Sequence, residues 1–294
     1  MISGAETNEE YHSSQALSCS GLKVFAQSPY RFRYRPEPQA TDAMTFGSLV
    51  HTMVLEPEKV AETYVVAPKV DRRTRAGKEE WQAFQDALLP GQEPVKADTY
   101  ELAKTVADRA QPWAAEIRRS WGQMGMGLAI EHSVRTQTEY GVLQTRPDIA
   151  HFSEGRIWDL KTISSLSRLE SQFWSMGYHL QDAFYRIVLE YELGWPMDPI
   201  EFHVVETEAP YETATVRLDP DTAALARHYV FGLLDRFRRC TDTDDWPGAY
   251  QGVHEMVPPG YLQKQLEEST SKTLAGMEAL AQYEAQRGTE EVAP

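Results

Sequence analysis

The chain has 294 residues, of which 41% are hydrophobic and 25% charged, and its formal net charge is −15 at pH 7. This composition is typical of a globular protein with a buried core, and the short apolar runs exclude a membrane-spanning helix. The polar N-terminus shows no secretory signal. Cys19 and Cys240 are too few for a four-cysteine zinc or iron–sulfur site and fit a reducing compartment, so we expect a cytoplasmic protein.

The distribution of charge is uneven, although the net charge argues against nucleic acid as a partner. Arginines gather in YRFRYR (30–35) and RRTRAGK (72–78), whereas acidic stretches lie at 239–245 and toward the C-terminus. An acidic exterior with a basic channel would suit a DNA enzyme. Scattered surface arginines are the alternative that composition leaves open.

The first part of the chain is dominated by helical patterns. The sequence predicts helices at 17–29, 45–57 and 99–119, with a short strand, a basic loop and a helix around Trp81 between 58 and 98. Ser18 or Ser20 is expected to cap the first helix, and Pro29 to end it.

From residue 129 the pattern changes to alternating apolar and polar residues with turn signals. It predicts three antiparallel strands over 129–163, and then a long helix at 170–192, strands at 200–207 and 214–219, and a helix at 220–240. We expect an α/β or α+β fold around a small mixed sheet. Residues 1–250 are predicted to form one domain, and 251–294 a polar, helical C-terminal tail.

The predicted strands carry charges that strands usually avoid. Asp159 and Lys161 are two residues apart and share one face, which turns Leu160 into the core. Asp148 precedes Asp159 by eleven residues and can face it across a hairpin. Two converging carboxylates repel unless a proton or cation lies between them, and such oxygen ligands suit Mg²⁺ or Mn²⁺. The alternative is an Asp159–Lys161 surface salt bridge with Asp148 in a turn.

The helix that follows places Trp174, Tyr178, Gln181 and Tyr185 at spacings of four, three and four, on one face. A buried glutamine needs hydrogen-bonding partners, which a phosphate or Lys161 could supply. A histidine at position 51 can complete a metal shell, although a lone helical histidine is more often structural.

Together these segments resemble the PD-(D/E)XK nuclease superfamily, and more narrowly the RecE-type phage exonucleases, over about residues 11–240. The matching segments are YHSSQALSCSGLKVFAQSP (11–29), FGSLVH (46–51) with LEP (55–57), DRRTRAGKEEW (71–81), RPD (146–148), DLKT (159–162) and YHLQDAFY (178–185). Asp159 stands where many members of the superfamily have glutamate, which the motif allows.

The resemblance implies a restriction-endonuclease-like core, built as α-β-β-β-α-β with a mixed central sheet flanked by helices. It implies a Mg²⁺-dependent exonuclease (Mn²⁺ is possible) that degrades linear double-stranded DNA 5′→3′ and leaves 3′ overhangs for recombination by single-strand annealing. Relatives form rings, so we expect a ring-shaped trimer or tetramer, a RecT-like annealing partner, no membrane, and a phage or prophage origin in a bacterial cytoplasm.

The resemblance and the residue chemistry together suggest roles in a two-metal mechanism. Asp148 would bridge two ions, Asp159 and the Leu160 carbonyl would bind the first ion, and His51 would bind the second. Lys161 would orient the attacking water, Gln181 would hold Lys161 or the scissile phosphate, and Tyr185 would pack or contact phosphate.

A further set of residues is expected to contact DNA. Ser20, with Arg31, Arg33 or Arg35, is expected to grip the 5′-phosphate, because arginine binds phosphate with two parallel hydrogen bonds. The other expected DNA contacts are Arg72, Arg73 and Arg146. Glu131 is expected to be an edge-strand surface charge rather than an extra ligand.

Three other functions remain open on the sequence alone. The first is a Cas4-like or helicase-associated nuclease, against which the missing cysteine cluster and helicase motifs argue. The second is a PD-(D/E)XK endonuclease, which would cut closed plasmid. The third is an inactive DNA-binding module, which the intact Asp148, Asp159 and Lys161 disfavour.

Overall fold

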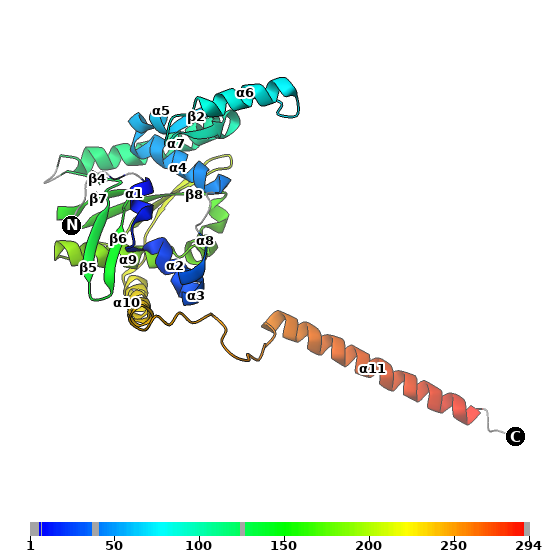
Figure 1. Cartoon of the computed structure of the whole chain (residues 1–294). Coiled ribbons are helices and arrows are strands. Elements are labelled where there is room, and N and C mark those ends of the chain that lie inside the picture. The colour runs from blue at the N-terminus through cyan, green and yellow to red at the C-terminus, as the bar shows by residue number, and fades with distance from the viewer. Residues whose placement is uncertain (1–5, 7, 37–40, 124–126, 291–294) are drawn as a thin grey trace. The chain divides into compact units, whose positions relative to one another are not determined.

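The computed structural model describes residues 6, 8–36, 41–123 and 127–290. The chain divides into two compact units, residues 1–249 and 250–294. The second unit contains one long helix, α11 (Gly260–Glu290), in the region where the sequence predicts a helix (Figure 1). Within the described part of the chain, no helix has both the length and the apolar character needed to cross a membrane.

A five-stranded mixed sheet forms the centre of the first unit. Its order is β10-β9-β8-β7-β4, in which β8 and β9 are parallel and the other neighbours antiparallel. The strands are β4 (Ala129–Ile130), β7 (Ile149–His151), β8 (Arg156–Ile163), β9 (Glu201–Glu206) and β10 (Thr213–Val216). The predicted mixed α/β architecture is confirmed.

The first unit also contains two smaller sheets. One has the order β1-β6-β5, from β1 (Leu17–Ser18), β6 (Gly141–Thr145) and β5 (Val134–Thr138), and the other pairs β2 (Tyr64–Ala67) with β3 (Glu93–Lys96). The sequence predicted three antiparallel strands over 129–163, whereas the structure has five, β4 to β8, because the chain bends between sheets. Glu131 adopts a left-handed φ of 48°, and its N–H donates to the Asp148 carbonyl at 3.0 Å.

Helices cover both faces of the central sheet (Figure 1). Their bounds are α1 (Asn8–Ser13), α2 (Cys19–Gln27), α3 (Pro29–Tyr34), α4 (Asp42–Leu55), α5 (Val60–Thr63), α6 (Arg75–Asp86), α7 (Ala97–Trp121), α8 (Leu169–Ser175), α9 (Tyr178–Leu193) and α10 (Pro220–Thr243). Pro29 does not end α2 as predicted: α2 ends at Gln27, and Pro29 is the first residue of α3.

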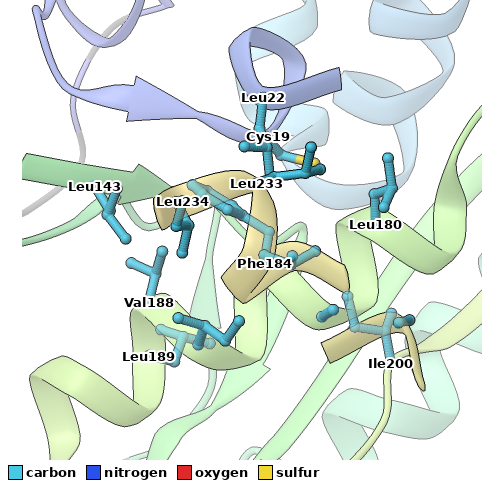
Figure 2. Close-up of a cluster of buried hydrophobic side chains, with 14 of the residues drawn as sticks. Cys19, Leu22, Leu143, Leu180, Phe184, Val188, Leu189, Ile200, Leu233 and Leu234 are labelled. Carbon is cyan, nitrogen blue, oxygen red and sulfur yellow. The ribbon is translucent and has the colours of Figure 1, made fainter. Parts of the chain in front are cut away.

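Alternation along β8 builds two cores. Trp158 and Leu160 pack into the cluster under α4 and α7, whereas Ile157 packs into the cluster formed by α2, α9 and α10. Figure 2 shows this second cluster, in which Leu22 of α2, Phe184 of α9 and Leu234 of α10 converge. Because neighbouring residues of a strand point to opposite faces, this arrangement directs Asp159 and Lys161 toward α9.

The predicted long helix over 170–192 is broken. Gly177 has a left-handed φ of 66° and separates α8 from α9. Trp174 therefore does not share a helical face with Gln181, as the sequence predicted, and its side chain is half exposed. The remaining stripe of Tyr178, Gln181 and Tyr185 lies on α9.

A second left-handed glycine sets the register of the β7–β8 hairpin. Gly155 has φ of 68° and directly precedes β8, and the hairpin pairs Ile149 with Trp158 and His151 with Arg156. A Cβ on Gly155 would lie 3.0 Å from the Pro196 carbonyl oxygen. Both the backbone angle and the space therefore favour glycine here.

We predict opposite effects for two glycine substitutions. Gly155→Ala should lower the free energy of unfolding by about 1–3 kcal/mol, because a side chain is strained in the left-handed region. Gly232→Ala, in the middle of α10 with open space around its Cα, should raise it by about 0.5–1 kcal/mol. Urea denaturation measures both free energies of unfolding. If Gly155→Ala had the same free energy of unfolding as the wild type, the explanation of the turn would be wrong.

Candidate active site

The predicted catalytic residues converge where β7 and β8 stop pairing. Asp148 lies in the bend before β7, and its Oδ2 accepts a hydrogen bond from the Leu160 N–H at 2.7 Å. The ladder ends at the Ile149–Trp158 pair, so this carboxylate replaces a strand partner for Leu160. In a strand the N–H and C=O of one residue point to the same side. The Leu160 carbonyl therefore faces the Asp148 edge, which suits its predicted role as a ligand.

Asp159 is buried and held from two sides. One carboxylate oxygen forms an ion pair with Lys161, and the other accepts from Gln181 Nε2 at 2.6 Å. Gln181 thus contacts Asp159, whereas the sequence suggested Lys161 or a phosphate as its partner. Its amide fixes the Asp159 carboxylate in place, and in doing so it satisfies its own need for a partner.

His51 and Glu131 complete a cluster around Asp148. His51 lies on α4, and its Nδ1 is 3.3 Å from Asp148 Oδ2. One ligand atom each of His51, Glu131 and Asp148 lies within 4.8 Å of the others. The expectation that Glu131 is a surface charge is therefore wrong. The bend at Glu131 turns its side chain toward Asp148, and the signal in the sequence was an acid directly after the apolar pair Ala129-Ile130.

Like charges dominate the electrostatics of this cluster. Burial, with the nearby Asp159 carboxylate, raises the pKa of Asp148 to about 6, although His51 opposes the shift. Burial and the Asp148 carboxylate raise the pKa of Glu131 well above its ordinary value. The ionised carboxylates repel one another in a site that excludes most water. A bound cation would relieve this repulsion.

Lys161 carries the opposite charge. Burial alone would lower its pKa, but the Asp159 and Asp148 carboxylates outweigh burial and raise it. The ammonium nitrogen also lies 5.4 Å from the centre of the Tyr178 ring, in a cation–π contact. Lys161 therefore stays protonated at neutral pH, so it can position a water or phosphate but cannot remove a proton.

Tyr185 lies on α9 and packs against the second core. Burial raises the pKa of its hydroxyl well above the ordinary value, and Tyr11 and Asp159 add to the shift. The hydroxyl therefore remains protonated, which suits the predicted packing or phosphate-contact role.

Most of the predicted DNA-contact residues lie either on or next to α2 and α3 or in the turn before α6. Arg31, Arg33 and Arg35 are exposed on or just after α3, and Ser20 is exposed on α2. Arg72 stacks on Trp81, and Arg73 pairs with Asp71 in the turn before α6.

Arg146 is a correction to the predicted set of DNA contacts. Its guanidinium is buried 4.3 Å from the centre of the Tyr11 ring, and Nε donates to Ser133 Oγ at 2.9 Å. A side chain that is 9% exposed and held in this way supports the N-terminal segment and offers little surface to DNA.

The donor set fits a divalent cation. His51 offers a nitrogen, and Glu131 and Asp148 offer carboxylate oxygens from positions where their charges repel. Hard oxygen donors with one imidazole suit Mg²⁺ or Mn²⁺. Asp159 lies beside this triad and is oriented by Lys161 and Gln181.

Comparisons with known proteins give the family of the chain and a structure of similar fold. The model of the family described as "PDDEXK-like domain of unknown function (DUF3799)" matches residues 18–255. The chain belongs to this PDDEXK-like family. Its fold also matches a crystal structure described as a "Putative exonuclease" from Eubacterium rectale, with a TM-score of 0.56 and 14% identity, over 87% of this chain and 97% of that one. No curated protein matches the chain.

Membership of the PDDEXK-like family places the chain in the PD-(D/E)XK nuclease superfamily, as the motifs predicted. The letters of that signature correspond here to Pro147-Asp148 and Asp159-x-Lys161. The family and the convergence of these residues around one cluster both point to a nuclease.

We predict that Asp148→Asn stabilises the metal-free protein. At pH 8 the native carboxylate is ionised, although its surroundings disfavour the charge and raise its pKa to about 6. Neutralising it should therefore raise the free energy of unfolding by about 1–3 kcal/mol. At pH 5 the native carboxyl is already largely protonated, so the gain should shrink. Thermal unfolding in EDTA at both pH values measures the difference.

The exposed control Asp108→Asn should leave stability unchanged at either pH. A loss of stability in Asp148→Asn at pH 8, or an equal effect at both pH values, would contradict the picture of crowded charges.

Proposed function

We propose that this protein is a divalent-metal-dependent exodeoxyribonuclease. It degrades linear double-stranded DNA 5′→3′ and leaves 3′ single-stranded overhangs for recombination by annealing. The observation that carries the proposal is the convergence of Asp148, Asp159 and Lys161 beside the His51–Glu131 pair. The order of the RecE-like motifs along the sequence supports the choice of exonuclease, as does the name of the Eubacterium rectale neighbour.

Each side chain has a role in phosphodiester hydrolysis. Lys161, protonated at neutral pH, holds the attacking water and offsets charge on the phosphate. Asp159 orients Lys161 through their ion pair, and Gln181 fixes Asp159 through its amide. This chain of contacts keeps the ammonium directed to one point above β8.

The carboxylates and the imidazole serve the metal. His51, Glu131 and Asp148 would hold a divalent cation, with Asp159 and the Leu160 carbonyl beside them. Such a cation lowers the pKa of a bound water and neutralises charge that develops on the phosphate. We propose two ions per site, as the resemblance to the RecE-type exonucleases implies.

The partners are proposed on the same basis. They are linear duplex DNA, a RecT-like annealing protein, and further copies of the chain in a ring-shaped trimer or tetramer. Ser20 on α2 is proposed to receive the 5′-phosphate together with one of the exposed arginines on or next to α3, Arg31, Arg33 or Arg35.

The test of the proposed activity is digestion of linear duplex DNA labelled at either end, with Mg²⁺, with EDTA, and with closed plasmid as a control. We expect Mg²⁺-dependent loss of the 5′-labelled strand while plasmid is spared. Cleavage of closed plasmid would instead make the protein an endonuclease. No cleavage with any divalent metal would make it a DNA-binding module.

Lys161→Ala should reduce hydrolysis by at least about 100-fold, the usual effect of removing one group that stabilises the transition state. Circular dichroism and DNA binding in EDTA should change little. Lys104→Ala, an exposed substitution on α7, is the matched control and should retain full activity. If Lys161→Ala kept most of its activity, the assigned role of this lysine would be wrong.

A further inference from the structure

A second lysine, Lys23, lies beside the candidate active site. The Lys23 ammonium of α2 is 5.6 Å from the centre of the Tyr178 ring, which Lys161 approaches to 5.4 Å. Among the described residues, no carboxylate lies within ion-pairing distance of Lys23. Two ammonium groups that share one ring repel each other. An anion beside Lys23 would offset this repulsion.

The pKa of Lys23 agrees with this description. Burial lowers it most, and the nearby Lys161 ammonium adds to the shift, whereas Cys19 and Asp159 oppose it. The lysine stem is confined, because a Cβ on Gly177 would lie 3.3 Å from Lys23 Cε. The backbone at the α8–α9 break therefore gives the lysine the space that it occupies.

A polar face continues from Lys23 along α2. Ser20, Lys23 and Gln27 are spaced by three and four residues, which places them on one side of the helix. Gln27 Oε1 accepts a weak hydrogen bond from Arg31 Nη1 at 3.5 Å, across the junction with α3. The face thus runs from the shared Tyr178 ring to the basic helix.

Two exposed tyrosines lie at the far end of this face. Tyr30 and Tyr34 are 56% and 58% exposed, and their ring centres are 4.7 Å apart. They line an open hollow of about 500 Å³ together with Val24, Gln27, Arg31, Arg35 and Pro36. Aromatic rings left open to solvent beside arginines are a common platform for stacked bases.

We propose that α2 and α3 form a track for single-stranded DNA that leads to the catalytic lysine. Lys23 contacts a backbone phosphate next to the scissile one, and Tyr30 and Tyr34 stack on unpaired bases. Residues 30–35 carry three arginines and no acid in a chain of net charge −15, so the track has the charge that DNA requires. A single strand is favoured over a duplex because only unpaired bases offer their faces for stacking.

This proposal deepens the proposed nuclease function and rests on it. It also gives residues 30–35 a role beyond recognition of the 5′-phosphate, because the two tyrosines and Lys23 would bind the bases and a phosphate of the single strand. The arginines next to the tyrosines would follow the backbone of the same strand.

The test is fluorescence anisotropy with a labelled oligothymidylate in EDTA, which prevents hydrolysis. Replacing both Tyr30 and Tyr34 by alanine should weaken binding by about 5- to 150-fold for each stacked base, with the salt dependence unchanged. Lys23→Met keeps the stem and removes one phosphate contact, so the slope of log K against log salt should fall by about 0.7. Tyr229→Ala and Lys104→Met, both exposed, are the controls and should bind as the wild type does.

The result separates this proposal from the nuclease proposal. If the wild-type protein cuts linear duplex and both sets of variants bind oligothymidylate normally, the track is wrong and the nuclease stands. If the tyrosine variants lose binding to closed duplex as much as to oligothymidylate, stacking on unpaired bases is also wrong. If oligothymidylate binding depends on the tyrosines but no divalent metal supports cleavage, the track stands and the nuclease proposal fails.

Discussion

The hydrogen bond from the Leu160 N–H to the Asp148 carboxylate determines how this site is built. An unpaired, buried N–H costs about 1–3 kcal/mol, and β7 offers no backbone partner beyond its pair with Trp158. A carboxylate in the bend before β7 satisfies that N–H. The same bond brings Asp148 beside Asp159, so one requirement of the sheet also assembles the acidic site.

The helices on both sides of the sheet then deliver the remaining groups. His51 comes from α4 on one face, whereas Gln181 and Tyr178 come from α9 on the other. Glu131 reaches the site only because its backbone adopts a left-handed conformation, which is strained for a residue with a side chain. Backbone strain and crowded charge lower the stability of the protein, as is expected where residues are arranged to bind a cation.

The sequence predicted the parts of this site that depend on short-range periodicity. Alternation along β8 places Asp159 and Lys161 together and turns Leu160 into the core, and the structure has this arrangement. The mixed sheet and the family were also predicted, from the pattern of elements and from motifs in a fixed order. The break at Gly177 was missed because a single glycine in an otherwise helical pattern is compatible with either a bend or a continuous helix.

The other misses depend on contacts between distant segments. Glu131 was expected at the surface because a bend between two sheets has no periodic signal, and its partners lie far away along the chain. The burial of Arg146 follows from contacts with Tyr11 and Ser133, which residue spacing does not predict. Without those contacts in view, Arg146 was expected to contact DNA. Propensity and pattern describe local structure, whereas these residues are placed by tertiary packing.

The central claim is that the bend between the sheets assembles a metal centre. The most direct measurement is anomalous X-ray scattering from crystals soaked with Mn²⁺. The account predicts an anomalous peak within bonding distance of His51, Glu131 and Asp148, and its loss in Glu131→Gln crystals. Well-ordered crystals with Mn²⁺ bound elsewhere, or with no peak at this cluster, would contradict it.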